Sequence, residues 1–481
     1  MQALQSHDLL SSDTHAMDQL QDFLRQRRAA HEPVKDLETF EQELHRLFVA
    51  AEREALGHEL ARFDLDVPAL DVGGERYHRV LRCATTSTSA AGPVRVERSL
   101  YRQGHGGGRA VCPLDLRAGI IEGAWTPWAA KQATWVVAHL TPQEGEELFA
   151  LLGNMTPSKS TLDRLPKQLS VHWEAQRPHF EAMLRQEEAI PDEAVAMAVA
   201  LDGVMAPMKD GQRQAKRTHA RAMGKAPSGP AGYQEVGCAT VSYYDRHGER
   251  LCTRRMARMP EPNKATLKSQ LTAEVMGALR QRPDLRVIKV ADGAPDNWSY
   301  LGEMLPFGEE VLDFYHVAEH LGAALGAAYG EGTPTYQERV ETLSEVLRDA
   351  PAGVETVMGA LCRLRTRYPR RKAIHKALAY FREHRHRMRY ASLRAQHLPI
   401  GSGVVEAACK TLVSQRLQRS GMRWRTAGGQ AILTLRALCQ SERFERAWSL
   451  LGETYKRSVT LPRNSERHRL QQMAIKSLAS I

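Results

Sequence analysis

Two short strand-like runs that each end in Asp-Gly constrain this 481-residue chain more than any other feature. The first run, AVAMAVAL, spans residues 194–201 and precedes Asp202, and the second spans residues 285–291 and precedes Asp292. Both are short for helices and are apolar enough for buried central strands. We therefore expect both acids at the carboxyl ends of strands, where open α/β sheets bind ligands. Taken singly, each Asp-Gly pair is also an ordinary turn dipeptide.

The segments around these runs predict the rest of a mixed sheet. Residues 235–244 and 249–256 are separated by a short polar turn, which predicts a hairpin. Residues 263–280 carry one apolar stripe at helical spacing, a helix is expected to begin near Pro295, and a further strand-like segment begins at Val311. Three antiparallel strands followed by two parallel ones are compatible with a ribonuclease-H-like sheet, although other α/β domains share parts of this order.

A third acid stands alone among cations farther along the chain. Glu406 is the one acid between Pro399 and Trp424. The turn at 401–403 offers an N-cap and good helix formers follow as far as Gly421, so Glu406 belongs in or beside the first helical turn. The alternative is a solvated helix in which Glu406 pairs with the lysine four residues on. The nearby cations, which we expect to contact phosphate, are Lys410, Arg416, Arg419, Arg423 and Arg425.

Three carboxylates on separate elements would repel one another unless cations or protons compensate. If the fold brought such carboxylates to one place, the site would imply metal, and oxygen-only ligation suits hard ions such as Mg²⁺ or Mn²⁺. Two such ions activate water or a 3′-hydroxyl and stabilise the leaving oxygen of a phosphodiester, so one site serves both strand cutting and strand joining.

Asp313 and His316 are candidate supporting residues. Asp313 also ends a strand, which makes it a rival for the second acid. His316 and His320 have the spacing of a zinc pair on a helix, but no third ligand is suggested, so packing or DNA contact is the preferred interpretation. We predict no zinc.

A pair of helices before the first strand predicts a DNA-reading motif. Thr141 begins a capping box with proline at the first helical position, and the helix is expected to stop at Gly153. A second helix is expected over residues 158–165. In a helix-turn-helix this second helix would present Lys159 and Arg164 to DNA, whereas an ordinary helical hairpin is the alternative.

The two ends of the chain predict further helices. Residues 37–48 carry apolar side chains at helical spacing and predict an amphipathic helix, either packed on its own domain or used as an interaction arm. Glycine, proline, serine and threonine cluster from about residue 62 to 115 and suggest short strands. A single helix is expected over residues 430–447, followed by a basic tail.

Positive charge is concentrated in two segments. The chain has 66 lysines and arginines against 56 acids, a formal charge of +10 that favours polyanionic partners. Residues 205–229 form a basic loop containing Lys216 and Arg217, which is either a solvated excursion or a phosphate contact. Residues 363–389 hold eleven lysines and arginines, including Arg370 and Arg371, against one acid. We expect a helical insertion that contacts phosphates rather than bases, with a solvated face as the alternative.

The cysteines and the hydropathy favour a reducing cytoplasm. Seven cysteines are spread along the chain without a CxxC pair, which supports neither a disulfide framework nor a zinc ribbon. No run of about 18 apolar residues occurs, so no membrane partner is expected.

Several motifs together resemble the ISKra family of bacterial insertion-sequence transposases, which are related to the Mutator-like enzymes. They are IGSGVVEAACK and RLQRSGMRW around Glu406, ALDGV around Asp202, VADGA around Asp292, DFYHVAEHL from Asp313, and HRMRY from His386. They occur in the family's order across roughly residues 95–450.

The resemblance implies a DDE enzyme with a ribonuclease-H-like fold and an acidic triad at Asp202, Asp292 and Glu406. It further implies binding of double-stranded DNA at the element's terminal inverted repeats and at the target, strand cleavage and transfer, and a homo-oligomer on DNA in the bacterial cytoplasm near the nucleoid. ISKra relatives often carry cysteine pairs in a zinc-ribbon-like element, but only Cys83 and Cys112 stand in that region here, so no metal is expected there.

The expected fold is α/β and multidomain, with a ribonuclease-H-like mixed-sheet core interrupted by an all-α insertion. A helical region and a small β and helix-turn-helix DNA-binding region precede this core. A catalytically inactive or domesticated DNA-binding descendant and a plain ribonuclease-H-like nuclease are the alternative functions. The expected boundaries are 1–62 and 63–185 for the N-terminal regions, 190–321 for the first part of the core, 322–400 for the insertion, 401–425 for the catalytic helix and 426–481 for the C-terminal helix and tail.

Overall fold

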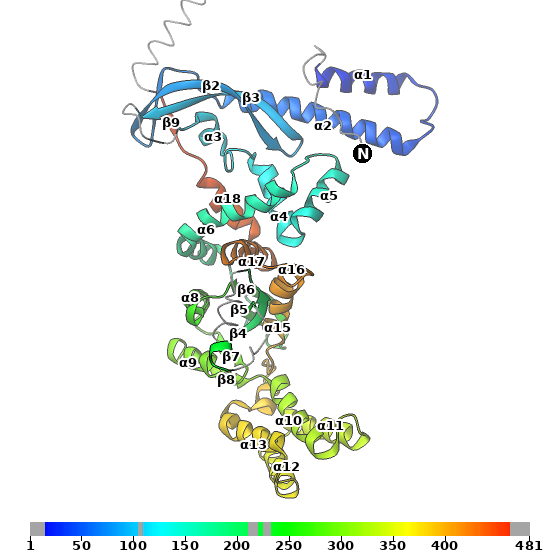
Figure 1. Ribbon diagram of the computed structural model, residues 1–481, viewed down its shortest axis with the longest axis vertical. Helices are drawn as coiled ribbons and strands as arrows, with labels where there is room; N and C mark the ends of the chain where they lie inside the picture. The colour runs from blue at the N-terminus through cyan, green and yellow to red at the C-terminus, as the bar shows by residue number, and fades with distance from the viewer. Residues whose placement is uncertain (1–14, 104–107, 109, 210–219, 225–231, 462–481) are drawn as a thin grey trace, which may run out of the picture. The chain divides into compact units, whose positions relative to one another are not determined.

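The computed structural model describes residues 15–103, 108, 110–209, 220–224 and 232–461 (Figure 1). The chain divides into two compact units, one of Met1–Trp173 with Arg446–Ile481 and the other of Glu174–Glu445. The divisions fall inside helix α6 (Lys159–Glu187) and helix α18 (Phe444–Glu453).

The second unit is built on a mixed five-stranded sheet in the order β6-β5-β4-β7-β8. β4 pairs antiparallel with β5, β5 pairs antiparallel with β6, and β7 and β8 continue the sheet in parallel with β4. Three antiparallel strands joined to two parallel ones in this order form a ribonuclease-H-like core, as the sequence predicts. The strands are β4 (Ala196–Pro207), β5 (Tyr233–Tyr244), β6 (Arg250–Arg258), β7 (Arg286–Ala291) and β8 (Glu309–Leu312).

β4 is longer than its apolar run. It continues through Asp202 and Gly203 to Pro207 because β5 pairs with it along its whole length. The Asp202-Gly203 pair is therefore part of a strand, and the alternative interpretation of this pair as a turn is wrong. β4 therefore continues beyond its pairing with β7, in which the last described pair is Ala200 with Val290.

The two faces of the sheet are covered by different helices. Leu201 and its neighbours across β5 and β6 belong to the cluster that includes apolar side chains of α8 (Ala265–Gln281). Cys238, which pairs with Asp202, belongs instead to a cluster with residues of the Glu406 helix and of α17 (Thr426–Gln440). Because consecutive strand residues point to opposite faces, Asp202 points toward the Glu406 helix.

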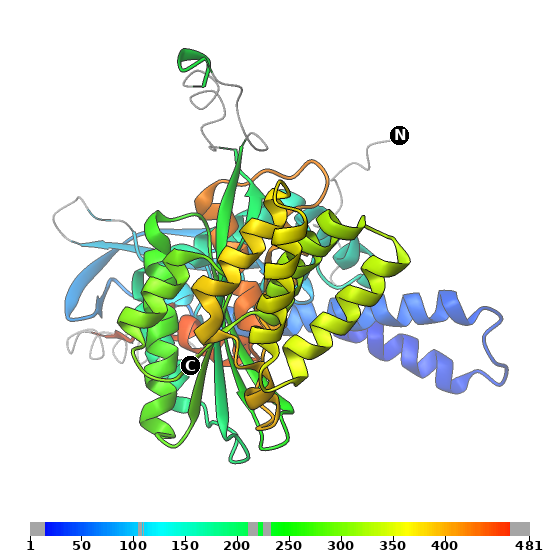
Figure 2. The same ribbon diagram turned by 90° about the horizontal axis from the view of Figure 1, so that it is seen from below.

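The chain between β8 and Glu406 is helical, as expected from its sequence. Figure 2 shows helices α10 to α13 lying side by side, and successive helices contact one another. A short 3-10 turn (Arg385–Arg387) and α14 return the chain to the sheet. The helices are α10 (Phe314–Tyr329), α11 (Pro334–Asp349), α12 (Gly353–Arg367), α13 (Lys372–His384) and α14 (Tyr390–Arg394).

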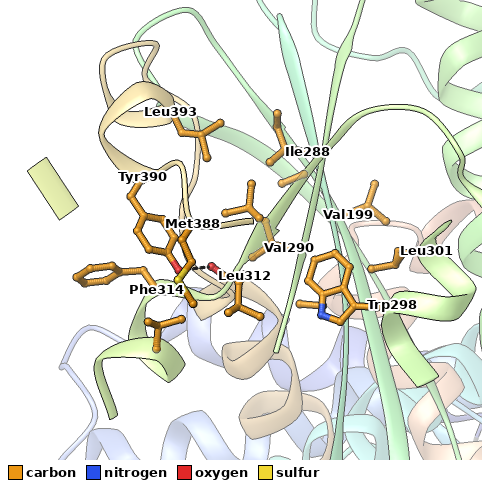
Figure 3. Close-up of a cluster of buried hydrophobic side chains, with 14 of the residues drawn as sticks. Val199, Ile288, Val290, Trp298, Leu301, Leu312, Phe314, Met388, Tyr390 and Leu393 are labelled. Carbon is orange, nitrogen blue, oxygen red and sulfur yellow. Dashed lines mark hydrogen bonds between the residues drawn. The ribbon is translucent and has the colours of Figure 1, made fainter. Parts of the chain in front are cut away.

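This insertion shares the core of the sheet. Figure 3 shows Met388, Tyr390 and Leu393 beside Val290 and Leu312, and all five side chains are buried. The Tyr390 hydroxyl donates a hydrogen bond of 2.9 Å to the Leu312 carbonyl at the end of β8. On the other side of the drawn cluster, α9 (Pro295–Met304) contributes Trp298 and Leu301.

The Glu406 segment is helical but irregular. α15 (Gly403–Ala408) passes into a π-helical turn (Cys409–Ser414) and then into the short α16 (Gln415–Leu417). The predicted extension to Gly421 is wrong, because the helix ends at Leu417 and Gly421 lies in a turn with φ +75°. The single helix predicted over residues 430–447 is two helices, α17 and α18, separated by a turn.

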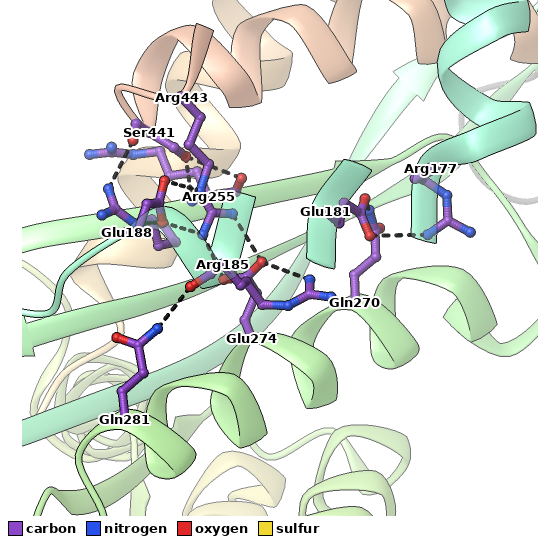
Figure 4. Close-up of polar contacts among 11 residues, drawn as sticks. Arg177, Glu181, Arg185, Glu188, Arg255, Gln270, Glu274, Gln281, Ser441 and Arg443 are labelled. Carbon is purple, nitrogen blue, oxygen red and sulfur yellow. Dashed lines mark hydrogen bonds and ion pairs between the residues drawn. The ribbon is translucent and has the colours of Figure 1, made fainter. Parts of the chain in front are cut away.

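A buried cluster of ion pairs joins α6, α8 and the turn after α17. Arg443 contacts Glu188 at 2.6 Å and Glu274 at 2.8 Å, and Arg185 also contacts Glu274 at 3.2 Å (Figure 4). Arg254 of β6 contacts Glu188 at 3.0 Å. Each carboxylate in this cluster thus faces at least two guanidinium groups.

The first unit begins with two helices and a four-stranded antiparallel sheet in the order β3-β2-β1-β9. Leu20 of α1 packs on Leu47 and Ala51 of α2, which favours packing of α2 within its own unit. The strands β2 and β3 are longer than expected from their composition. The elements are α1 (Ala16–Ala29), α2 (Leu37–Arg62), β1 (Ala69–Val72), β2 (Glu75–Ser89), β3 (Gly92–Gln103) and β9 (Val459–Thr460).

Three further helices lead to α6. They are α3 (Pro113–Ala118), α4 (Pro127–His139) and α5 (Pro142–Leu152). The capping box at Thr141 and the stop at Gly153 are confirmed. α6 does not end at Leu165 as predicted but continues through Pro166, because buried Leu162, Leu165 and Leu169 hold one face of it in the core. No helix in the described part of the chain is both long and apolar enough to cross a membrane.

Candidate active site

The register of the parallel strands brings three acids to one edge of the sheet. Ala200 pairs with Val290, so Asp202 and Asp292 lie at the same level two residues farther on. Ala291 pairs with Leu312, so Asp313 follows at the same level on the third strand. Asp292 and Asp313 follow directly after β7 and β8 at the carboxyl edge of these parallel strands, as predicted for Asp292. The prediction that Asp202 also ends a strand is wrong, because Asp202 lies within β4, which pairs with β5 as far as Pro207.

Asp202 is half-buried and held from two sides. Its Oδ1 accepts a hydrogen bond of 2.7 Å from the Gly203 amide, and the Cys409 thiol donates to its Oδ2 at 3.6 Å. Burial raises the pKa of the Asp202 carboxyl, and the negative charges of Asp292 and Glu406 raise it further. Asp292 and Glu406 are therefore both near enough to act electrostatically on the Asp202 carboxyl.

Asp292 is fixed by the turn that follows β7. Its Oδ1 accepts hydrogen bonds from the Ala294 amide at 3.1 Å and from Asn297 Nδ2 at 3.2 Å. Asn297 Nδ2 also donates to the Leu201 carbonyl at 3.4 Å, and Trp298 Nε1 donates to the Asp292 carbonyl at 2.6 Å. Asn297 thus links the Asp292 turn to the residue that precedes Asp202.

Glu406 lies in the first turn of α15 and is exposed, as predicted for its position. Its Oε1 accepts a hydrogen bond of 2.6 Å from the Ser402 hydroxyl, the residue at the N-cap. Ser402 in turn donates its backbone amide to Asp313 Oδ1 at 3.0 Å. This chain of contacts ties the start of the Glu406 helix to the end of β8.

Asp313 is buried and engaged by backbone amides. Besides the Ser402 amide, Tyr315 N donates to Oδ1 and His316 N donates to Oδ2, each at 3.2 Å. Asp313 therefore caps α10 and holds the loop before Glu406. These contacts suit a positioning residue better than a metal ligand.

An aromatic and imidazole cluster from α10 and α13 lies beside Asp292. His320 stacks on Tyr380 with ring centroids 4.0 Å apart, and His316 and His384 pack edge-on to Tyr380. A Cβ added to Gly293 would lie 2.6 Å from the Tyr380 ring, so glycine is required for this approach. Burial lowers the pKa values of His320 and His384. Burial also raises the pKa of Tyr380, and the charges of Asp292 and Asp313 add to the rise.

The carboxylates at this edge suit a hard cation by their chemistry, since all are oxygen donors. Among the residues that the structure describes, however, no three His, Cys, Asp or Glu side chains stand close enough together to form a ready metal-ligand set. The charges of Asp292 and Glu406 act on the Asp202 carboxyl, so the three lie in one neighbourhood, and a metal there stays a prediction.

Cations surround the Glu406 helix. Lys410, Arg419, Arg423 and Arg425 are exposed, as a phosphate-contacting role requires. The predicted phosphate contact of Arg416 is wrong. Only 1% of this residue is exposed, and its guanidinium lies 5.5 Å from the Trp424 ring centroid. A buried arginine cannot reach a phosphate at the surface, so the role of Arg416 is packing.

The remaining predicted DNA contacts differ in their surroundings. Lys159 is exposed but faces α5, where its Nζ contacts Gln143 at 3.4 Å, while Arg164 is exposed on α6. Arg370 and Arg371 are exposed between α12 and α13. The remaining two, Lys216 and Arg217, lie outside the described residues.

Three contacts at the site were not predicted from sequence. Cys409 follows Glu406 by one helical turn, so its position beside Asp202 could have been inferred once the helix was docked. Asn297 follows Asp292 within the next helix and offered a similar local signal. Tyr380 is 88 positions from Asp292, and no local pattern indicates their proximity.

Comparisons with known proteins give one remote structural likeness and no match to a family model or a curated protein. No protein-family model matches this chain, and no curated protein matches it. Among solved structures, the Drosophila P element transposase strand transfer complex aligns with 12% identity and a TM-score of 0.26, over 74% of this chain and 84% of that chain. A likeness this remote carries no argument about activity, so the functional interpretation depends on the geometry of the site.

Proposed function

We propose that this chain is a DDE transposase that binds the terminal inverted repeats of an insertion sequence and performs DNA strand cleavage and strand transfer. The observation that supports the proposal is that Asp202 and Asp292 lie side by side toward the carboxyl edge of a ribonuclease-H-like sheet, and that the charges of Asp292 and Glu406 act on the Asp202 carboxyl. Exposed arginines on the segment after Glu406 would attract the phosphate backbone. The resemblance of the motifs to ISKra transposases supports the same function.

The three carboxylates would hold two Mg²⁺ or Mn²⁺ ions. When bound, such ions offset the repulsion among the carboxylates and supply Lewis-acid activation of water or of a 3′-hydroxyl. In cleavage, a water oxygen bonds to phosphorus and the bond from phosphorus to the 3′-oxygen breaks, leaving a 3′-hydroxyl. In joining, this 3′-hydroxyl attacks a target phosphodiester and a target 3′-oxygen leaves.

The protein's own residues would orient these groups. Asn297 and the Ala294 amide fix the Asp292 carboxylate, and the Cys409 thiol fixes that of Asp202. Asp313 holds the Ser402 amide, and Ser402 holds Glu406 by its hydroxyl. Exposed Arg419 and Arg423 would neutralise phosphates of the bound strand.

The test is strand cleavage and joining on labelled DNA that carries the element's terminal repeats, with Mg²⁺ present. Glu406→Gln keeps the shape of the side chain and removes its charge, so we expect cleavage to fall by at least about 1,000-fold while DNA affinity stays within about twofold. Glu303→Gln, at an exposed position of α9, is the matched control and should cleave normally.

Other outcomes separate the alternatives. Wild-type protein that binds the repeats but cuts nothing with Mg²⁺ or Mn²⁺ would favour a DNA-binding descendant. This alternative agrees with the lack of a ready metal-ligand set among the described residues. Cleavage without joining would favour a nuclease. Normal cleavage by Glu406→Gln would remove Glu406 from the site.

A further inference from the structure

Arg387 makes contacts that a place in a basic, DNA-facing insertion does not explain. It ends the short 3-10 turn between α13 and α14, and only 16% of its side chain is exposed. Its guanidinium lies 3.9 Å from the ring centroid of Trp298 on α9, and its Nε donates to Glu310 Oε2 at 2.7 Å. Arg387 is therefore held against α9 and β8, unlike the exposed cations of the same insertion.

Glu310 connects Arg387 to the strand that leads to Asp292. Glu310 of β8 pairs with Lys289 of β7, and Lys289 Nζ donates to Glu310 Oε1 at 3.2 Å. Lys289 is buried, and its Nζ also donates to the Leu305 carbonyl at the end of α9 at 2.9 Å. The carboxylate of Glu310 thus joins the insertion to β7 and α9 through two cations.

Trp298 extends this connection to the candidate site. One side of its contacts is the Arg387 guanidinium, and its Nε1 donates to the Asp292 carbonyl at 2.6 Å. A guanidinium over an indole ring is attracted by the ring electrons, more strongly where water is excluded, and Trp298 is buried. The stack therefore restricts the indole to the orientation in which it holds Asp292.

The residue before Trp298 holds the other end of Asp292. Asn297 Nδ2 donates to Asp292 Oδ1 at 3.2 Å, so one turn of α9 fixes both the backbone and the carboxylate of Asp292. A catalytic group misplaced by about 1 Å can slow a reaction by about 100-fold. The placement of α9 against Arg387 is therefore able to control the activity of Asp292.

We infer that Arg387 is a positioning residue for Asp292 and acts through Trp298. The inference rests on the proposed function, in which Asp292 is a catalytic carboxylate. It gives the insertion a second role beyond DNA binding, because the turn that ends α13 then sets the geometry of the carboxylate at the end of β7.

The experiment compares Arg387→Met with Arg389→Met. Both substitutions remove one positive charge from the same basic segment, but the Arg389 side chain is 62% exposed and lies 3.8 Å from its nearest carboxylate, Glu309. Arg389→Met is therefore matched for the loss of charge and keeps the stack on Trp298. Arg387→Lys, which keeps the charge but not the planar guanidinium, is the conservative variant.

Four quantities would be measured for each variant. They are the single-turnover cleavage rate on repeat DNA with Mg²⁺, the Kd for the same DNA, the melting temperature without DNA, and the amide hydrogen exchange of residues 292–301 without DNA. The exchange measurement includes the Ala294 amide, which donates to Asp292 Oδ1, so it reports on the Asp292 turn independently of cleavage.

For Arg387→Met we expect cleavage about 10- to 100-fold slower than for Arg389→Met, with Kd values of the two variants within about twofold of each other. Arg387→Lys should cleave at an intermediate rate. Exchange over residues 292–301 should be faster in Arg387→Met than in Arg389→Met, while exchange in β5 should be the same in both. Faster exchange in β5 as well would assign Arg387 to general stability and overturn the inference.

A double-mutant cycle tests the path through Trp298. Trp298→Phe keeps an aromatic ring but loses the hydrogen bond to the Asp292 carbonyl, so it should also slow cleavage. If Arg387 acts through Trp298, the double variant should cleave within about threefold of the slower single variant. Rate losses that multiply would show that Arg387 acts independently of Trp298, which overturns the inference.

The outcomes distinguish failure of the inference from failure of the proposed function. Equal cleavage by Arg387→Met and Arg389→Met, while wild type is active, overturns the inference and leaves the proposed function intact. If Arg387→Met does not fold, a wild-type cleavage rate and wild-type exchange in Arg387→Lys overturn the inference. If wild type itself does not cleave, the proposed function fails, and unchanged exchange over residues 292–301 in Arg387→Met would separately overturn the positioning of Asp292.

Discussion

Two groups of carboxylates in the second unit have opposite surroundings, and their pKa values are shifted in opposite directions. Glu188 and Glu274 are buried, and each faces two arginines. Burial disfavours the charge on Glu274, yet Arg443 and Arg185 hold its pKa below its ordinary value. Asp202, by contrast, has its pKa raised by burial and by other carboxylates.

The difference separates a structural cluster from a candidate reactive one. In the ion-pair cluster each carboxylate is compensated by two arginines of the protein, so neither carboxylate needs a bound cation. At the edge that holds Asp202, the charges of Asp292 and Glu406 act on a carboxyl that no arginine compensates in the same way, and a cation or a proton would offset this repulsion. Perturbed carboxylates of the second kind are enriched at functional sites.

The largest effect on stability is expected from the ion-pair cluster. Glu274→Gln would leave Arg443 buried with part of its compensation removed, so the free energy of unfolding should fall by about 3–5 kcal/mol. Denaturant unfolding followed by circular dichroism measures this change. Glu341→Gln, at an exposed site on α11, is the control and should change it by less than about 0.5 kcal/mol. Equal effects of the two variants would contradict a structural role for the cluster.

The next effect is a dependence on pH. The pKa of Glu274 is lowered from an ordinary 4.5, so its stabilising contribution is complete above that value and is lost as pH falls toward the lowered pKa. The difference in unfolding free energy between wild type and Glu274→Gln should therefore shrink from neutral pH to about pH 3. If this difference in unfolding free energy grew on acidification, the pKa of Glu274 would be raised rather than lowered. Unfolding curves at several pH values measure it.

The smallest effect on stability is expected from substitution of Asp202, and this substitution should stabilise the protein rather than destabilise it. Its pKa is raised from 3.8, so the folded state loses stability as pH rises above that value. Asp202→Asn removes this repulsion and should raise the melting temperature at neutral pH by roughly 1–2 °C, with no gain well below pH 3.8. Mg²⁺ should then stabilise wild type more than the variant.

Asp296→Asn, at an exposed position after Asp292, serves as the control for Asp202→Asn. It should shift the melting temperature little at any pH. A fall in melting temperature for Asp202→Asn at neutral pH would show that this carboxylate is compensated like Glu274, and the contrast between the two clusters would disappear.

Local sequence was sufficient for much of the fold. Apolar runs predicted β4 and β7, the turn at Asp245 predicted the hairpin of β5 and β6, and Thr141 marked the start of α5. Errors arose where partners outside the segment decided its extent. β4 continues through Asp202-Gly203 because β5 pairs with it, and α6 continues through Pro166 because leucines on one face are buried.

The candidate site was predictable in part for the same reason. Asp292 could be assigned to a strand end and Glu406 to a first helical turn from their own neighbours in sequence, whereas Asp202 lies within β4 and not at its end. Arg416 could not be told from Arg419, because both are arginines in one basic segment, and only packing decides that the first is buried and the second exposed.

The sequence by itself determined the acids, their secondary-structure positions, the helical nature of the insertion and the excess of positive charge. These depend on short-range preferences and on composition. Only the tertiary structure decided that Asp202 meets the Cys409 thiol, that Asn297 links the Asp292 turn to Leu201 within β4, and that Tyr380 reaches Gly293. Such contacts join residues far apart in the chain, and their positions follow from strand register and helix packing, which no local pattern encodes.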